Sequence, residues 1–131
     1  MPIDDDPGTT GGNTFSAKID GVDWMPASIT GFEAYGSLLL NAAASGNTSS
    51  IGLNVPSNIS PGVYDLDWNT DIFGQYNIGI SVFMQSTSGT LTITQHNTTT
   101  GLIEGSFSFD AEELAGTETA EITDGEFSIT Y

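Results

Sequence analysis

The oxygen-bearing side chains best spaced for chemistry lie in one short segment. They alternate along the chain as Asp65, Asp67, Asn69 and Asp71. Hard oxygen ligands suit Ca²⁺, and this spacing matches the beginning of a calcium-binding loop. The segment departs from the EF-hand pattern, because Thr70 replaces the required glycine and Tyr76 replaces the bidentate glutamate. We therefore predict a calcium site here, and the alternative is a polar strand end followed by a solvated turn.

A second group of carboxylates fills the last quarter of the chain. Its eight members are Glu104, Asp110, Glu112, Glu113, Glu118, Glu121, Asp124 and Glu126. Carboxylates this close in sequence repel one another, and salt should relieve that repulsion. A solvated acidic loop is the simpler interpretation, and a second divalent-cation site is the alternative.

Residues suited to catalysis are sparse. His96 is the single histidine, and no Gly-x-Ser-x-Gly motif accompanies it, so a serine hydrolase triad is not expected. We expect His96 in an exposed turn. The absence of cysteine also excludes the usual zinc sites. Glu33 and Glu104 could form the carboxylate pair of a glycoside hydrolase, but nothing in the sequence brings them together. The chain is not expected to be an enzyme.

The charge balance excludes several classes of partner. The chain has 17 acidic residues against one lysine, Lys18, and its formal net charge is −16. A surface this negative repels phosphate backbones and anionic lipid headgroups, so we expect neither nucleic acid nor an anionic membrane surface as a partner. The chain also lacks the cations that clamp phosphate and carboxylate substrates.

The acidic residues are unevenly distributed. Residues 34–64 and 72–103 contain no Asp, Glu, Lys or Arg. We expect any partner to contact strands from these uncharged stretches. Five aromatic residues could stack on sugar rings if several share an exposed face, or else fill the core: Trp24, Trp68, Tyr35, Tyr64 and Tyr76.

Alternating hydrophobicity predicts strands along most of the chain. The predicted strands are 15–19, 29–35, 37–43, 50–56, 62–68, 76–85 and 90–96. Asp20-Gly21 is a two-residue hairpin signal that follows the first of them. The segment 111–116 is the only one that could form a helical turn. No connection is long enough to carry a crossover helix, so an antiparallel meander is expected.

The C-terminal region contains an internal echo. Residues 104–109 read Glu-Gly-Ser-Phe-Ser-Phe, and residues 124–129 read Asp-Gly-Glu-Phe-Ser-Ile. Each copy predicts a strand, and the acidic linker 110–121 would let the two strands pair as a long-looped hairpin. Gly105 and Gly125 are predicted to be bulges or close-approach positions.

These patterns predict a single-domain all-β fold. We expect about nine or ten antiparallel strands that form a sandwich or a flattened barrel. Residues 1–13 are interpreted as a flexible acidic and glycine-rich leader, and residues 14–131 as the β-domain.

Several motifs resemble a family of exported, mostly lipid-anchored proteins of unassigned function from Bacteroidota. The opening F-x-A-x-I-D-G-x-x-W runs from Phe15 to Trp24, and a central G-x-Y-x-L runs from Gly62 to Leu66. The ending pairs G-x-F-S-F, from Gly105, with I-T-D-G-x-F-S-I-x-Y, from Ile122. The resemblance implies export to the periplasm or the cell exterior. It also implies tethering to the outer membrane through a lipidated cysteine, which this sequence does not contain.

The function expected from these observations is non-catalytic. We expect an exported or cell-surface domain that binds a glycan, an envelope protein or a divalent ion, with calcium as the candidate cofactor. One alternative is a structural subunit that self-associates through strand edges. A further alternative is a small-molecule carrier with a ligand in a barrel cavity.

Overall fold

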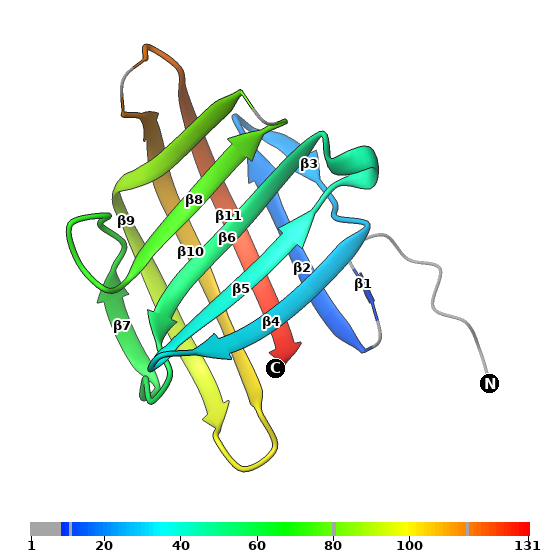
Figure 1. The fold of residues 1–131 in the computed structure, drawn as a ribbon, viewed down its shortest axis with the longest axis vertical. Helices are drawn as coiled ribbons and strands as arrows, with labels where there is room; N and C mark the ends of the chain where they lie inside the picture. Colours follow the sequence, from blue (N-terminus) through cyan, green and yellow to red (C-terminus); the bar gives the residue numbers. More distant parts are fainter. Residues whose placement is uncertain (1–8, 11, 80, 115) are drawn as a thin grey trace.

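The computed structural model of the chain describes residues 9–10, 12–79, 81–114 and 116–131 (Figure 1). Within these residues the chain is all-β, as predicted. Its strands are β1 (Thr9–Thr10), β2 (Asn13–Ile19), β3 (Val22–Trp24), β4 (Ser28–Ala34), β5 (Ser37–Ala43), β6 (Ser49–Pro56), β7 (Gly62–Asp65), β8 (Phe73–Ile78), β9 (Val82–Asn97), β10 (Leu102–Glu113) and β11 (Thr119–Thr130), with one 3-10 turn, η1 (Ser45–Asn47). The strand β1 lies inside the predicted leader, most of which falls outside the described residues.

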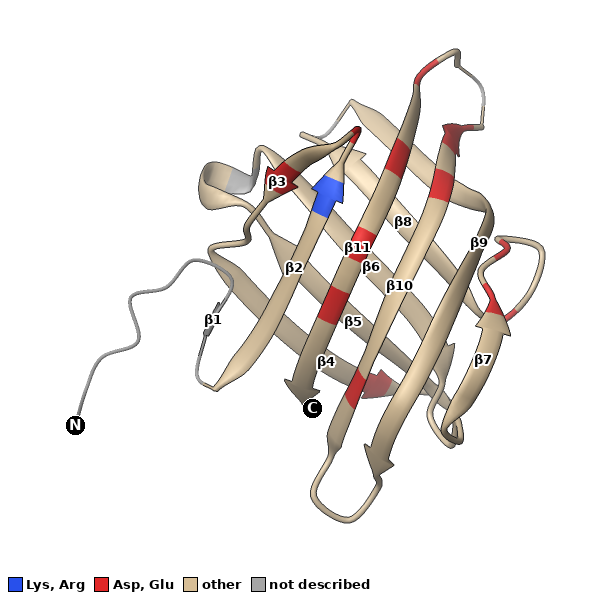
Figure 2. Cartoon of the chain, turned by 180° about the vertical axis from the view of Figure 1, so that it is seen from behind, with Lys and Arg blue, Asp and Glu red and all other residues tan. Residues whose placement is uncertain are grey.

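All strands belong to one antiparallel sheet. The hydrogen-bonded order is β1-β2-β11-β10-β9-β8-β6-β5-β4, while β3 pairs with β2 and β7 pairs with β9. The sheet curls so that β4, β5, β6 and β8 form one layer, in front in Figure 1, and β2, β9, β10 and β11 form the other, in front in Figure 2. We call these the neutral layer and the acidic layer, because the charged strands of Figure 2 lie mainly in the second.

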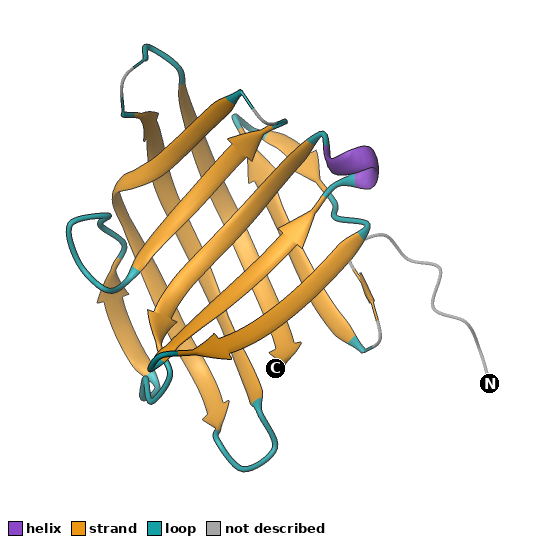
Figure 3. Cartoon of the chain, in the orientation of Figure 1, coloured by secondary structure: helices purple, strands orange, loops and turns teal. Residues whose placement is uncertain are grey.

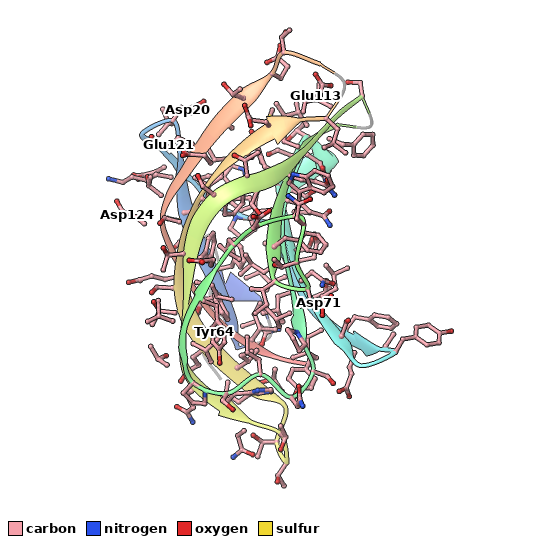
Figure 4. The ribbon with its side chains drawn as sticks, turned by 90° about the vertical axis from the view of Figure 1, so that its left-hand side faces the viewer. Asp20, Tyr64, Asp71, Glu113, Glu121 and Asp124 are labelled. Atoms are coloured by element: carbon pink, nitrogen blue, oxygen red, sulfur yellow. The ribbon has the colours of Figure 1, made fainter. Side chains whose placement is uncertain are left out.

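The predicted flattened barrel agrees with this curled sheet. Strands and short turns make up nearly all of the described chain (Figure 3). The edge-on view shows the two layers facing each other across the core (Figure 4). At the end of the strand order, β4 lies beside β1, β2 and β11 but pairs only with β5.

Strand β9 joins the two layers. Its beginning pairs with β8, and Gly62–Asp65 of β7 pairs with its later residues 90–93. The predicted strand 76–85 is wrong at this point, because a turn that includes Gly79, at φ 58°, divides it. The separate strand predicted at 90–96 is instead part of β9. Gly89 of β9 lies against the backbone of Ser108 and Phe109 of β10. Because Gly89 has no side chain, β10 can stay close to β9 where β9 passes from one layer to the other.

The core lies between the inward faces of the two layers. The neutral layer contributes side chains such as Leu40 and Leu53, and the acidic layer contributes Phe107 and Ile129. The largest fully buried side chains are Phe15, Leu38, Leu40, Ile51, Leu53, Leu66, Met84, Leu91, Ile93, Ile103, Ile122 and Ile129. Inward apolar residues alternate with outward polar ones, and burial of this continuous apolar surface is what stabilises the curl.

The internal echo forms a reciprocal pair in β10 and β11. Gly105 is opposite Phe127, and Phe107 is opposite Gly125. A Cβ atom added to Gly125 would lie 2.5 Å from the ring of Phe107, and one added to Gly105 would lie 3.1 Å from Cζ of Phe127. The predicted close approach is therefore confirmed at both glycines: the Phe107 ring covers Gly125, whereas Gly105 lies closest to the backbone carbonyl oxygen of Thr92 on β9 and next to the Phe127 ring.

The linker between the echo copies differs from its prediction. Strand β10 continues to Glu113 and β11 begins at Thr119, so the predicted long loop is mostly strand. The predicted helical turn at 111–116 is wrong over its first half. Ala111 is buried and opposite Ala120, and an inward-facing alanine pair extends the sheet alternation where local propensity favours a helix.

Candidate functional site

The outer face of the neutral layer carries no charged side chain. Cross-strand pairing arranges its outward residues in three rows, which we call the neutral face. They are Phe32, Leu39, Asn54 and Phe73; Thr30, Asn41, Gly52 and Gln75; and Ser28, Ala43, Ser50 and Asn77. The strands β5, β6 and β8 come from the uncharged stretches of the sequence, and for this reason they contribute no charged side chain to the face. Glu33 of β4 is opposite the buried Leu38 and therefore does not belong to the neutral face.

Exposed apolar groups and amides are mixed on this face. Phe32 is 63% exposed, Leu39 is 39% exposed, and Phe83 of the adjoining β9 is 57% exposed. The neighbouring polar groups are amides and hydroxyls, which donate and accept hydrogen bonds without carrying charge. Asn54 Nδ2 donates to the carbonyl oxygen of Asp71 at 3.1 Å, which orients one of these amides. The surface is therefore suited to a neutral, hydrogen-bonding partner.

The outer face of the acidic layer has the opposite character. Ser and Thr hydroxyls alternate there with carboxylates, and a shallow hollow of about 490 Å³ opens among Thr90, Ser108, Asp124 and their neighbours. A bulge in β11 places Asp124 at φ 51°, and its carboxylate is 3.7 Å from Lys18 Nζ. Figure 4 shows Asp20, Glu121 and Asp124 on the outside of this layer. Both groups of the ion pair are solvent-exposed, so the pair stabilises the fold little.

The four residues of the predicted calcium site lie at the end of β7 and in the loop after it. Asp65 ends that strand, and Asp67, Asn69 and Asp71 lie in the loop before β8. The Asp67 Oδ1 atom accepts hydrogen bonds from the backbone N–H of Asn69 at 3.0 Å and from its Nδ2 at 3.1 Å. Nowhere in the described part of the chain do three His, Asp or Glu side chains gather as a metal site. The loop is held by its own hydrogen bonds, and the calcium site remains a prediction.

The C-terminal acids are mostly on strands, where the sequence predicted a solvated loop. Asp110 is directly opposite Glu121 in the β10–β11 pair. The Asp20 carboxylate accepts the backbone N–H of Glu121 at 2.8 Å. Asp20, Asp110, Glu112 and Glu121 line a surface hollow of about 380 Å³. Because these side chains point into water, they form a repulsive surface and a second cation site remains a prediction.

His96 is not in an exposed turn, so that prediction is wrong. Strand β9 extends through this residue, which is half-buried. Its Nδ1 lies 2.6 Å from the carbonyl oxygen of Ile59, and its Nε2 lies 2.8 Å from the hydroxyl of Tyr131. A carbonyl oxygen can only accept, so Nδ1 donates to Ile59, and the second contact with the Tyr131 hydroxyl gives His96 a bridging structural role.

The candidate carboxylate pair is divided between the two layers. Glu33 is on β4, whereas Glu104 is on β10 and accepts a 2.8 Å hydrogen bond from the Ser128 hydroxyl. Burial, with a further contribution from the Glu33 charge, raises the pKa of Tyr131 above its ordinary value. The strands of Glu33 and Glu104 are not hydrogen-bonded neighbours in the sheet.

The five candidate aromatic residues do not share one exposed face. Trp24 and Tyr64 pack against the core, and Tyr76 is buried. Of the five, Tyr35 and Trp68 are exposed, at 106% and 41%. The sequence reasoning missed Phe32 and Phe83, which lie on the outer surface because of strand register.

The carrier alternative, with a ligand inside the barrel, stays a prediction. Large side chains fill the space between the layers, and each of the hollows described above opens on the outer surface. In the described residues there is also no helix of the length and hydrophobicity needed to cross a membrane.

Comparison with known proteins gives a family without a function. The family described as domain of unknown function (DUF6252) matches residues 12–129. No curated protein and no solved structure matches the chain.

Proposed function

The chain belongs to the DUF6252 family, and since that family has no assigned function, we propose one from the surfaces of this chain. It is a non-catalytic binding domain, exported to the cell surface, that contacts its partner through the neutral face. The resemblance in the motif residues supports export and a lipid anchor. A precursor that carries a signal peptide followed by a lipidated cysteine is the test of that address.

One observation supports the binding role above the others. The chain has 17 acidic residues, yet none of those in the described part of the chain is on the neutral face. A charged group costs free energy when a partner removes it from water, and the centres of protein interfaces are correspondingly depleted of charge. Exposed Phe32 and Phe83 on the same surface supply apolar area that a partner can cover. The face therefore combines low desolvation cost with apolar contacts.

The test uses a matched pair of isosteric substitutions. Gln75→Glu places a charge on the neutral face, at the β8 end of its middle row, and Gln95→Glu places the same charge on an exposed position of β9 opposite Glu104. The probes are suspensions of cellulose, mannan and starch, and outer-membrane proteins immobilised on beads. We expect at least one probe to retain the wild-type chain, with retention reduced by Gln75→Glu and unchanged by Gln95→Glu. Equal behaviour of the two variants, or no retention by any probe, contradicts the proposal.

A structural subunit is the second candidate, and the edge of the sheet supports it. Within the described residues β4 pairs with β5 alone, and its seven residues include neither lysine nor proline. Although β4 also lies beside β1, β2 and β11, it lacks these two residues, which commonly block strand addition at an edge. Light scattering after size-exclusion chromatography tests this: growth of oligomers with concentration supports the subunit, and a monomer at millimolar concentration contradicts it.

Calcium is a proposed ligand of the loop after β7, supported by the alternating oxygen groups of Asp65, Asp67, Asn69 and Asp71. Millimolar calcium should raise the melting temperature of the wild-type chain but not of Asp67→Ala. No shift in the wild type contradicts a calcium site.

A further inference from the structure

The two-residue turn between β4 and β5 has an unusual residue, a tyrosine, in its first central position. Ala34 pairs with Ser37, so Tyr35 and Gly36 form a two-residue loop, with φ values of 53° and 80°. Two positive φ values identify the mirror-image turn that fits the twist of a hairpin. This turn favours Asn, Asp or Gly in its first central position, because a bulky side chain is strained at positive φ.

The other non-glycine residues with positive φ follow the ordinary preference. They are Asp20 and Asp124. Asp20 begins the equivalent turn between β2 and β3, with Gly21 at φ 83°, and its carboxylate accepts the Glu121 N–H. Tyr35 occupies the same type of position with a side chain that is 106% exposed. Packing of its ring against the protein therefore does not explain why a tyrosine is there.

The tip of this hairpin is continuous with the neutral face. Phe32 precedes Tyr35 by three residues, is 63% exposed, and begins the row that continues through Leu39 and Asn54. The backbone N–H of Ser57 donates to the Gly36 carbonyl at 2.9 Å, which fixes the turn to the loop after β6. In Figure 4 the end of the β4–β5 hairpin projects beyond the layers. The exposed ring of Tyr35 is thus held by a hydrogen-bonded turn near Phe32, the first residue of that row.

The chemistry of this surface selects one class of ligand. Aromatic rings provide flat apolar area, and Asn and Gln amides pair with hydroxyl groups as both donors and acceptors. Anionic ligands are disfavoured, because the surface offers no cation and the chain carries a net charge of −16. Four residues on adjacent strands, from Phe32 to Phe73, span about 14 Å, which suits an extended chain of repeated hydroxylated rings.

We propose that Tyr35, with Phe32, is the anchor of a neutral polysaccharide site that extends along the row Phe32, Leu39, Asn54 and Phe73. This inference rests on the proposed binding function and names its ligand class. Tyr35 stacks on a sugar ring at the projecting tip, and the amides of Asn54 and Asn41 bond to hydroxyl groups farther along the face.

The experiment compares stability with binding in the same variants. Tyr35→Asn places a preferred residue in the turn, so its melting temperature should rise, by about 3 °C. Its affinity for soluble neutral hexasaccharides of glucose, mannose and xylose, measured by calorimetry, should fall about tenfold or more. Tyr35→Phe keeps the ring and should retain the affinity. Val22→Ala changes another exposed side chain, 68% exposed, beside the other hairpin turn and should leave both quantities unchanged.

The outcomes separate this inference from the proposed function. Wild-type affinity in Tyr35→Asn overturns the anchor. If no hexasaccharide binds while the immobilised proteins still retain the chain in a Gln75-dependent manner, the polysaccharide inference fails and the binding function stands. If phosphatidylcholine vesicles bind the chain through Tyr35 and the sugars do not, the surface is a membrane contact and the inference is overturned. If no probe binds, both proposals fail.

Discussion

The two layers have similar inner faces and dissimilar outer faces. Both layers present alternating apolar residues to a shared core, in which Leu40 of one and Ile129 of the other are fully buried. Outside, the neutral layer exposes amides and aromatic rings, whereas the acidic layer exposes hydroxyls and carboxylates such as Asp110 and Glu121 (Figure 2). Because the same kind of core supports both, folding does not require this difference. The difference therefore supports the proposal that the two outer faces have different surroundings.

The largest expected effect is a difference in the stability lost when a glycine of each layer is replaced by alanine. Gly125→Ala should destabilise the fold by about 2–3 kcal/mol, because the new methyl group would overlap the Phe107 ring. Gly52→Ala in the neutral layer should cost less than about 1 kcal/mol, since its nearest neighbour is Asn41 Oδ1 at 3.4 Å. Urea unfolding measures both. Equal losses would show that the Phe107 ring does not make Gly125 less tolerant of a side chain than Gly52.

A smaller effect concerns a hydrogen bond that connects the two halves of the sheet. Trp24 Nε1, on the β3 strand beside the acidic layer, donates to Ser49 Oγ of β6 at 2.8 Å. Ser49→Ala leaves this part-buried indole N–H without its partner and should cost about 1 kcal/mol in urea unfolding. Ser50→Ala is the control, because its hydroxyl meets only the Asn77 amide, at 3.5 Å. A neutral result for Ser49→Ala argues that packing alone joins the layers.

Alkaline pH should act on one tyrosine in each layer. Burial raises the pKa of Tyr76 on β8 and of Tyr131 after β11, with added effects of the Asp20 and Glu33 charges respectively. The unfolded chain then loses these protons first, so stability is complete below about pH 10 and falls as pH rises above it. Thermal melts from pH 8 to 11 should show a shallower decline for Tyr76→Phe. The melting temperature of the exposed-site variant Tyr35→Phe should decline with pH as in the wild type. If the melting temperature of Tyr76→Phe declines as steeply as that of the wild type, the contribution of Tyr76 is contradicted.

The smallest effect comes from the repulsive surface. Asp110 and Glu121 are directly opposite on β10 and β11. Like charges in this position are unfavourable, so Glu121→Gln should stabilise the fold by about 0.3–0.5 kcal/mol at low salt. In 0.5 M salt the gain should disappear, because screening removes the repulsion. Chemical unfolding at the two salt concentrations checks this, and a gain that persists in salt points to a cause other than charge.

Much of the fold could be predicted from local sequence. The alternation of Phe15, Ala17 and Ile19 and the Asp20-Gly21 turn indicated the first hairpin, which β2 and β3 form. The repeated Gly-x-Phe motif indicated the close approach of β10 and β11. These signals are reliable because each depends on a few neighbouring residues.

The errors arose where pairing across the sheet decides the outcome. The alternation around Ile78 and Val82 continues through the turn that contains Gly79, so only the pairing of β8 with β9 reveals the break. Residues 72–103 are uncharged, yet part of β9 lies in the acidic layer. The uncharged stretches therefore indicated the neutral face only in part. Its composition depends on register, which turns Leu39 outward and Leu38 inward.

The most direct test of the account is a footprint of a bound neutral hexasaccharide on the backbone amides. Hydrogen–deuterium exchange, or amide chemical shifts in a titration, locates the contact on one layer or the other. Changes are expected only in β4, β5, β6, β8 and the Tyr35-Gly36 turn. Changes centred on β10 and β11, or no change with any of the neutral hexasaccharides, contradict the claim that the neutral face is the binding surface.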